Sequence, residues 1–244
     1  MPVYNGRKYF EDALLSVLSS ATEEDEIVVV EDGSIDGGVQ HIVERHISRT
    51  PIRYLSKSNG GVASALNVGL EVASKTIFTW LSHDDLYLPN RLASDRDMRR
   101  LLPDLVTVSN FYLLYEETGQ CIHVNSTRKI GNRQTIKLLG SRFINGNCLS
   151  APVQLLKSVG GFNEALRHTQ DYDLWCRLLQ TTTLTAIPSP TVISRQHPNQ
   201  DSKRAPKAAQ EEYKRLLMNY LTFSDIIDPR NVIEILKITS NALK

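Results

Sequence analysis

The stretch Ile27-Val28-Val29-Val30-Glu31-Asp32-Gly33-Ser34 begins with apolar residues and ends in a polar turn that contains glycine. A short apolar run bounded by turn residues is typical of a strand buried in a sheet. Apolar residues recur at helical spacing before this stretch, from 7 to 20, and after it, from 39 to 47. We therefore expect a buried strand with a helix on each side of it in the sequence.

The first half of the chain repeats this alternation of strand and helix. Apolar runs at 52–55 and 76–81 predict two more strands, and helical spacing from 62 to 73 predicts the helix between them. Strands that alternate with helices over short connections form mostly parallel sheets covered on both faces. The expected fold class is α/β, with a Rossmann-like mixed, mostly parallel sheet flanked by helices.

The second half predicts a hairpin, several helices and a helical tail. Strands at 105–116 and 121–125 flank the turn residues Thr118 and Gly119. Helices are expected at 133–139, 152–158 and 172–179, and tail helices with proline near the first turn are expected at 206–221 and 229–243. The expected organisation is one domain over residues 1–203 and a C-terminal helical extension over 204–244.

Residues 1–5 look like the end of a strand whose beginning is missing. A buried strand of a parallel sheet usually has about five or six residues, and Pro2 has no amide hydrogen to donate to a strand ladder. We expect the shortened first strand to weaken the fold. Residues added upstream should then raise the thermal stability.

Composition and charge describe an ordinary globular chain. With 244 residues, 41% of them hydrophobic and 23% charged, it is long enough for one large domain. Its formal net charge of +1 gives no reason to expect nucleic acid as a partner. Cys121, Cys148 and Cys176 lack the spacing of a zinc site, which favours reduced thiols in a cytosol.

The sequence contains no candidate membrane span or signal peptide. No window approaches the roughly 20 apolar residues of a span, and the first residues lack the charged-then-apolar order of a signal. The lysine-rich tail after Pro206 can form amphipathic helices, which pack on their own domain or lie on a membrane surface. The expected location is cytoplasmic, with peripheral contact at the inner face of the membrane left open.

Carboxylates follow two of the expected strands. Asp32 follows the first, and the neighbouring pair Asp84 and Asp85 follows another, with His83 beside it. Because ligands of open α/β sheets bind outside the carboxyl ends of strands, these residues should share the edge of one crevice. Mg²⁺ and Mn²⁺ prefer oxygen ligands and bind through one or two carboxylates plus substrate phosphates. The alternative is that each carboxylate caps the following helix.

The segment 58–69 lies between those two turns and contains Gly60, Gly61 and Gly69. Small residues allow a ligand to approach closely, and a helix N-terminus near Gly61 offers backbone donors. The segment has neither the lysine of a P-loop nor the glycine spacing of a dinucleotide site. It is either part of a ligand site or a loop before a tightly packed helix.

Two further pairs of polar residues near the end of the domain are candidates for the site. Asp171 and Asp173 lie two residues apart, so they point from different faces of a helix. Asp171 is either a helix cap or a base at the mouth of the crevice. Arg195 and His197 follow an expected strand at 191–194 and suit either a phosphate or the protein surface.

Taken in order, these segments resemble the family 2 glycosyltransferases, which are inverting nucleotide-sugar enzymes with a GT-A fold. The resemblance covers about residues 1–200. Its blocks are Pro2-Val3-Tyr4-Asn5, Val28 to Ser34, Asn59-Gly60-Gly61 with Ala65-Leu66-Asn67, Ser82-His83-Asp84-Asp85, Gly160-Gly161-Phe162, and Gln170 to Trp175. No single block is specific, but six in the expected order are hard to reach by chance.

The resemblance implies a role for each matching residue. The residues implied to bind the nucleotide sugar are Pro2, Tyr4, Asn5, Asp32, Asn59, Asn67, His83, Asp84 and Arg195. His83-Asp84-Asp85 stands as a DxD-like group, with Asp85 as a ligand of a divalent metal, Mn²⁺ or Mg²⁺, and His197 as a second ligand. Asp171 matches the catalytic base. The chain departs from the family pattern at Leu66, where arginine is common, and at His83, where the pattern has an acidic residue.

The implied activity is inverting transfer of a sugar from a nucleoside-diphosphate sugar to a hydroxyl of a glycan or lipid-linked saccharide. The resemblance mildly favours a UDP-sugar as donor. Two alternatives stay open. One is a nucleotide-sugar-binding module with impaired catalysis, and the other is a nucleotidyltransferase. A nucleotidyltransferase would be expected to carry a glycine-rich phosphate loop near its first strand, and residues 2–7 contain none.

Overall fold

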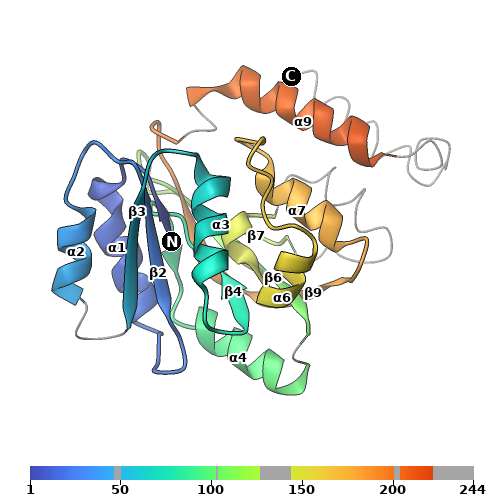
Figure 1. Ribbon diagram of the computed structural model, residues 1–244, viewed down its shortest axis with the longest axis horizontal. Coiled ribbons are helices and arrows are strands. Elements are labelled where there is room, and N and C mark those ends of the chain that lie inside the picture. Colours follow the sequence, from blue (N-terminus) through green and yellow to red (C-terminus); the bar gives the residue numbers. More distant parts are fainter. Residues whose placement is uncertain (47–50, 103, 127–143, 201–203, 222–244) are drawn as a thin grey trace.

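The computed structural model describes residues 1–46, 51–102, 104–126, 144–200 and 204–221 (Figure 1). Its helices are α1 Arg7–Leu18, α2 Val39–His46, α3 Val62–Val72, α4 Arg91–Leu101, α6 Val153–Ser158, α7 Gln170–Leu178 and α9 Pro206–Tyr220, with a 3₁₀ turn η2 at Gly146–Cys148. Its strands are β1 Pro2–Val3, β2 Ile27–Asp32, β3 Ile52–Lys57, β4 Ile77–Thr79, β5 Leu86–Tyr87, β6 Val106–Tyr115, β7 Cys121–Val124, β8 Leu149–Pro152 and β9 Leu184–Gln196. The helices expected at 133–139 and 229–243 lie outside the described residues.

The N-terminal sheet has the strand order β1-β2-β3, and all its pairs are parallel. Helices α1 and α2 lie on one side of β2 and β3, and α3 lies on the other (Figure 1). Helix α1 buries Phe10, Leu14 and Val17 at helical spacing, as the sequence pattern predicts. The β-α units expected for the first half are therefore present.

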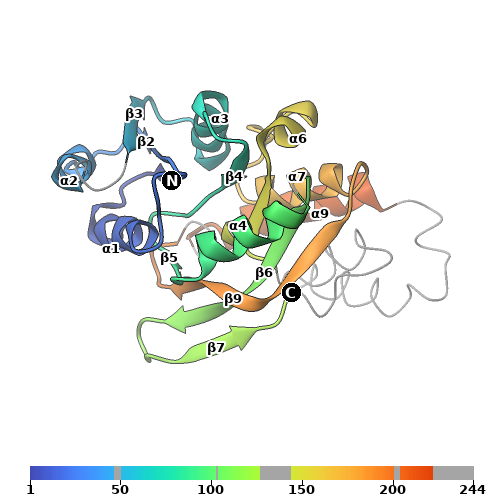
Figure 2. The same ribbon diagram turned by 90° about the horizontal axis from the view of Figure 1, so that it is seen from below.

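The second sheet is mixed and has the order β4-β8-β6-β9-β5, with β7 paired to β6. Strands β6 and β9 run parallel, and the expected hairpin is the antiparallel pair β6 and β7 (Figure 2). The strand expected at 76–81 forms only over Ile77–Thr79 and pairs antiparallel with β8. Trp80 and Leu81 leave the strand and pack into the hydrophobic core, and the chain then turns toward β5.

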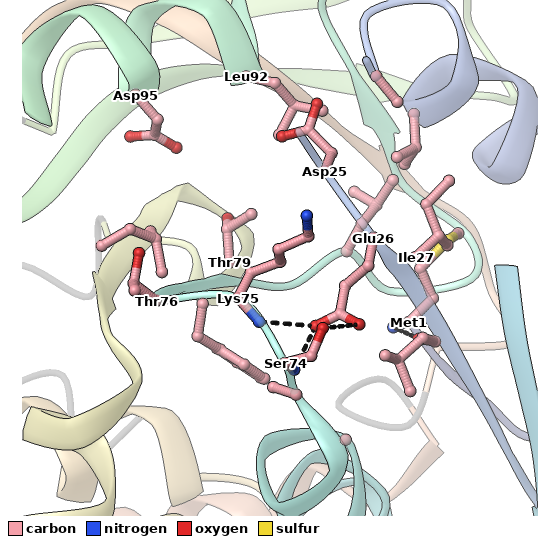
Figure 3. A pocket seen from close by; sticks show the side chains of 18 of the residues that line it. Met1, Asp25, Glu26, Ile27, Ser74, Lys75, Thr76, Thr79, Leu92 and Asp95 are labelled. Carbon is pink, nitrogen blue, oxygen red and sulfur yellow. Dashed lines mark hydrogen bonds between the residues drawn. The ribbon is translucent and has the colours of Figure 1, made fainter. Parts of the chain in front are cut away.

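A cavity of about 620 Å³ lies between the two sheets, away from the carboxyl ends of β1 and β2. Its walls include Ile27 of β2, Gly69 of α3 and Phe78 of β4. At its edge the Glu26 carboxylate accepts hydrogen bonds from Ser74 and Lys75 (Figure 3). The cavity also borders Met1, whose ammonium group donates to the Val28 carbonyl at 2.6 Å. The stabilising effect expected of a longer first strand stays a prediction.

The three cysteines are free, with Cys121 exposed and the other two buried. Burial raises the pKa of the Cys148 thiol and of the Cys176 thiol to about 12, so both stay protonated at neutral pH. Within the part of the chain that the structure describes, no helix is long and apolar enough to cross a membrane.

Candidate active site

A cleft of about 540 Å³ opens at the carboxyl ends of β1 and β2 and extends to α7 and the end of β9. Most of the residues singled out from the sequence line it. They are Pro2, Tyr4, Asn5, Asp32, Asn59, His83, Asp84, Asp85, Asp171 and His197. The structure thus brings groups from six separate segments of the chain to one cavity.

Asp32 fixes the loop that precedes α3. Its Oδ1 accepts hydrogen bonds from Lys57 Nζ at 2.7 Å and from the Gly60 amide at 2.9 Å, and its Oδ2 accepts from the Gly61 amide at 2.7 Å. Gly61 adopts φ +88, a conformation that glycine reaches without strain. Asp32 therefore does not cap the helix that follows it. It instead holds the backbone of the segment 58–61 against the cleft.

The first two loops at the cleft are tied together by Asn5 and its neighbours. Asn5 has φ 47, its amide donates to Ser34 Oγ at 3.1 Å, and its Oδ1 accepts from the Ile35 amide at 2.9 Å. Asp36 Oδ2 accepts from the Arg7 amide at 2.9 Å, so it satisfies a donor at the start of α1 and not one in α2, the helix that follows it. Tyr4 stays 38% exposed beside these bonds. These hydrogen bonds join the loops after β1 and β2 into a rim of the cleft, and the Tyr4 ring is accessible on this rim.

Asp84 and Asp85 have separate surroundings. Asp85 is only 5% exposed, and its two oxygens accept hydrogen bonds from the Arg195 amide at 2.8 Å and from the Asn147 side chain. Burial raises the pKa of Asp85 well above its usual range, and the neighbouring charge of Asp84 adds to this rise. Asp84 Oδ2 lies 3.0 Å from His197 Nε2.

Neither carboxylate of this pair caps α4. Strand β5 separates the pair from α4, and the N-cap residue of α4 is Asn90, which makes no side-chain cap hydrogen bond. The capping alternative is therefore wrong for Asp84 and Asp85.

The donor set fits a divalent cation that a substrate helps to bind. Within the described residues, no three histidine, cysteine or carboxylate side chains form a complete metal cage. Mg²⁺ and Mn²⁺ do not need one, since they commonly take one or two carboxylates together with substrate phosphates. The buried carboxyl group of Asp85 and the buried His197 Nδ1, which has no hydrogen-bond partner, are both compatible with a cation in this part of the cleft.

Asp171 occupies the first turn of α7 and faces the cleft. The Tyr172 amide donates to its Oδ1 at 2.8 Å. Burial raises the pKa of Asp171 to about 7, and the charge of Glu212 contributes. A carboxyl group with this pKa can take up and release a proton at neutral pH.

Asp173 has a different role from Asp171. Its Oδ2 accepts from Arg177 Nε at 2.9 Å, and its Oδ1 accepts from the Tyr220 hydroxyl of α9 at 2.9 Å. One oxygen is thus engaged within α7, and the other holds α7 to α9. Asp171 therefore faces the cleft and Asp173 packs against α9, so the two carboxylates point from different faces of the helix, as their spacing predicts.

The structure corrects the placement of Asn67 and Arg195, which do not line the cleft. Asn67 bridges the Phe162 backbone, donating to its carbonyl at 2.8 Å and accepting from its amide at 2.8 Å, because α3 turns this side chain toward the loop before α7. The Arg195 guanidinium lies 3.0 Å from Asp12 and over the ring of Tyr9. The Arg195 backbone reaches the site instead, because its amide donates to Asp85 and its carbonyl accepts from Gln200.

The sequence gives no signal for several residues in or behind the cleft. Lys57 pairs with Asp32, Asn147 donates to Asp85, and Gly146 lets the chain pass close to Asp171. A lysine at a strand end and an Asn-Gly-Asn turn are common surface features, so their residue types give no specific signal. The fold alone brings Gly146 and Asn147 to the cleft and places Lys57 behind it, against Asp32.

The chain matches the model of the family described as Glycosyl transferase family 2 over residues 1–136. It belongs to this family. A glycosyltransferase of Rickettsia felis is 38% identical over 210 residues, which cover 84% of this chain and 35% of the relative. A glycosyltransferase of Rickettsia typhi is 33% identical over 227 residues, which cover 91% of this chain and 70% of the relative. This family 2 chain thus spans about a third of the length of several relatives.

Solved glycosyltransferases share the fold of this family 2 chain. S. aureus TarS 1-349 in complex with UDP-GlcNAc superposes with a TM-score of 0.74 at 17% identity, over 98% of this chain and 69% of TarS 1-349. Mannosyltransferase PcManGT from Pyrobaculum calidifontis, in complex with GDP-Man and Mn²⁺, gives a TM-score of 0.67 at 17% identity, over 99% of this chain and 68% of that protein. The expected fold class, α/β of the GT-A type, is confirmed.

Proposed function

We propose that this chain is the catalytic part of an inverting glycosyltransferase that moves a sugar from a nucleoside-diphosphate sugar to a hydroxyl acceptor. The observation that carries the proposal is the convergence of Asp171 and the pair Asp84 and Asp85 on one cleft. A carboxyl group whose pKa is about 7 suits the role of base. A second, buried acidic group, Asp85, suits a divalent cation that would neutralise the charge of the diphosphate.

Donor binding is assigned to the rim formed by β1, β2 and the loop before α3. Tyr4 offers an accessible ring, and Asn5, Asp32 and Asn59 surround it with polar groups. The solved relatives that bind UDP-GlcNAc, or GDP-Man with Mn²⁺, support a nucleotide-sugar donor. A UDP-sugar stays a mild preference that comes from the family resemblance.

In the proposed reaction Asp171 takes the proton of the acceptor hydroxyl as its oxygen forms a bond to the anomeric carbon. The bond from that carbon to the diphosphate breaks on the opposite face, and the configuration inverts. A divalent cation, Mn²⁺ or Mg²⁺, supplies charge neutralisation for the departing diphosphate when it is bound, and Asp85 and His197 are the residues that would hold it. Asp84 orients His197 and contacts the ribose or sugar of the donor.

The acceptor is proposed to enter past the start of α7. Arg167, His168, Gln200 and Arg204 line the cleft there, so this part of its wall is polar and partly cationic. Such a wall suits a hydroxyl-rich and anionic molecule, such as a glycan or a saccharide carried on a lipid phosphate. A cytoplasmic location and peripheral contact with the membrane through the tail belong to the same proposal.

The two alternative activities have less support. A nucleotidyltransferase is disfavoured by membership of family 2 and by the absence of a phosphate loop at residues 2–7. The place of Asp171 in the cleft, with a pKa raised to about 7 by burial, favours a catalytic chain over a binding module with impaired catalysis.

The test is a donor screen with UDP-, GDP- and dTDP-sugars in the presence of Mn²⁺, with and without glycan acceptors. Release of nucleoside diphosphate that rises with acceptor, and a product of inverted anomeric configuration by NMR, would support the proposal. A product of retained configuration would contradict the direct displacement. Exchange of pyrophosphate would support the nucleotidyltransferase, and binding measured by calorimetry without turnover would support the module.

A further inference from the structure

A buried carboxylate of helix α9 accepts hydrogen bonds from the backbone of residues 167–169, which directly precede α7. Glu212 is 6% exposed. Its Oε2 accepts from the Arg167 amide at 2.9 Å, and its Oε1 accepts from the His168 amide at 2.7 Å. Oε1 also accepts from the Thr169 amide at 2.7 Å and from the Thr169 hydroxyl at 2.8 Å. Three consecutive backbone donors and one hydroxyl thus converge on one side chain.

These bonds fix the segment that leads into α7 and do not cap the helix itself. Thr169 is the N-cap residue of α7, but its side chain makes no cap hydrogen bond to the helix. Its hydroxyl donates to Glu212 instead. The hydrogen bonds from the backbone of 167–169 lower the pKa of Glu212 despite its burial, so this carboxylate is ionised at neutral pH. A negative charge near the first turn of α7 also suits the helix dipole.

Helix α9 contacts the first turn of α7 at a second point. The Tyr220 hydroxyl donates to Asp173 Oδ1 at 2.9 Å, and the Tyr213 ring meets the Tyr172 ring edge to face at 6.3 Å. Figure 1 shows α9 lying along α7. Asp171 is therefore placed between two residues, Thr169 and Asp173, that are both bonded to α9.

We propose that Glu212 is a positioning residue for Asp171, through its hold on the backbone of residues 167–169. This inference rests on the proposed function, because it assigns Asp171 the role of base. It also makes α9 part of the catalytic unit, so that the unit extends past residue 203, where the sequence placed its end, to at least Tyr220. Sugar transfer then depends on a helix that contributes no group to the chemistry itself.

The charge of Glu212 should also affect the pH dependence of activity, through the pKa of Asp171. Among the groups that face Asp171, the Glu212 charge raises the pKa of Asp171 beyond the effect of burial. The other titratable groups of the same cleft are on different elements and include His83, Asp84, Asp85, Arg167, His168 and His197. If Glu212 loses its charge, the pKa of Asp171 should fall, and the acidic limb of the activity profile should move to lower pH.

The test is Glu212→Gln, with Glu211→Gln as the matched control. Glu211 is the preceding residue of α9 and pairs only at the surface, with Lys214 at 2.9 Å. For Glu212→Gln we expect unchanged donor affinity, a fall of about tenfold or more in kcat from misplacement of the base, and a lower pH midpoint of kcat/KM. For Glu211→Gln we expect wild-type values of all three.

A second variant keeps the proposal testable if Glu212→Gln does not fold. Thr169→Ala removes one of the four hydrogen bonds but leaves the charge of Glu212, so kcat should fall while the pH midpoint stays at the wild-type value. Wild-type kcat in either variant, or an unmoved pH midpoint in folded Glu212→Gln, would overturn the proposal. An inactive wild-type chain would instead contradict the proposed function, which separates the two failures.

Discussion

Asp84 and Asp85 are neighbours in the chain, but their carboxylates bind different partners. Asp85 accepts hydrogen bonds from the Arg195 amide and Asn147, whereas Asp84 lies 3.0 Å from His197 Nε2. The pair therefore directs its two carboxyl groups to two different places at the cleft. Burial raises the pKa of the Asp85 carboxyl group well above its usual range. A cation beside Asp85 would offset this cost of burying its charge.

Asp85→Ala should abolish metal-dependent binding of the donor. The variant removes a buried oxygen ligand, so nucleotide-sugar affinity should no longer respond to Mn²⁺ in a calorimetric titration. Asp97→Ala is the matched control, because Asp97 is an exposed carboxylate on α4 whose partner is Arg100 at 3.6 Å. A Mn²⁺ response in Asp85→Ala equal to that of the wild type would remove Asp85 from the metal site.

Asp171→Asn should separate binding from transfer. The amide keeps the size of the side chain but cannot accept the proton of the acceptor hydroxyl. We expect donor affinity within about twofold of the wild type and a fall in turnover of roughly 10²–10⁴-fold, the usual contribution of a general base. Rapid-quench assays of single turnover would measure the chemical step directly. Wild-type turnover by this variant would refute the assignment of the base.

The pH profile of kcat/KM should rise through an acidic limb with a midpoint near pH 7. The base must be ionised to accept a proton, and burial raises the pKa of Asp171 to about 7. A limb with its midpoint near pH 4, the range of an ordinary aspartate, would contradict this environment.

The free energy of unfolding should also depend on pH through Asp171, and it should decrease as the pH rises. The pKa of Asp171 is higher in the folded state, at about 7, than its ordinary value of 3.8. Stability from its protonated form is therefore fully present below about pH 4 and is lost as pH rises through 7. Thermal melts of Asp171→Asn should lack this loss, so the variant should gain stability relative to the wild type at pH 8.

The strand and helix pattern of the first half predicts the N-terminal sheet well, because each element there has a regular apolar period. The stretch 27–34 forms a buried strand followed by a turn that holds Asp32 at the cleft, as expected. The strand at 76–81 was predicted too long, because Trp80 and Leu81 are apolar for a different reason. They pack in the core beyond the end of β4. A short apolar run does not distinguish these two environments.

The site was predictable where a residue acts through its type and position in a turn, and not where it acts through a distant partner. Asp171 could be proposed as a base because a helix start places it at an opening. The carboxylate of Glu212 meets the Thr169 amide across 43 positions of sequence, and nothing local marks it. Asn67 carries a side chain suited to a ligand, but the packing of α3 directs it to Phe162. Such contacts depend on tertiary structure alone.

Asn67→Ala should affect stability rather than donor binding. The side chain satisfies both the amide and the carbonyl of Phe162, and its loss leaves these groups without that partner. We expect a decrease of about 1–3 kcal/mol in the free energy of unfolding, measured by denaturant titration, with donor affinity unchanged. Asn59→Ala is the contrasting variant, since Asn59 lines the cleft and should lower affinity. A large loss of donor affinity in Asn67→Ala would show that Asn67 does take part in donor binding.

Gly146→Ala should impair the reaction through the shape of the site. A Cβ at this position would overlap the ring of Trp80 and lie 3.2 Å from Asp171 Oδ2, so the ring or the backbone of residue 146 must move and the carboxylate must shift with it. Overpacking of this kind costs about 1–3 kcal/mol in stability, and displacement of the base should lower kcat more than it raises KM. Gly69→Ala is the matched control, because its Cβ would meet only Val30 at an ordinary distance of 3.8 Å and alanine favours the helix α3. Steady-state kinetics and thermal melts of both variants would check this. Equal kinetics in the two variants would show that the close approach of Gly146 to Asp171 has no part in catalysis.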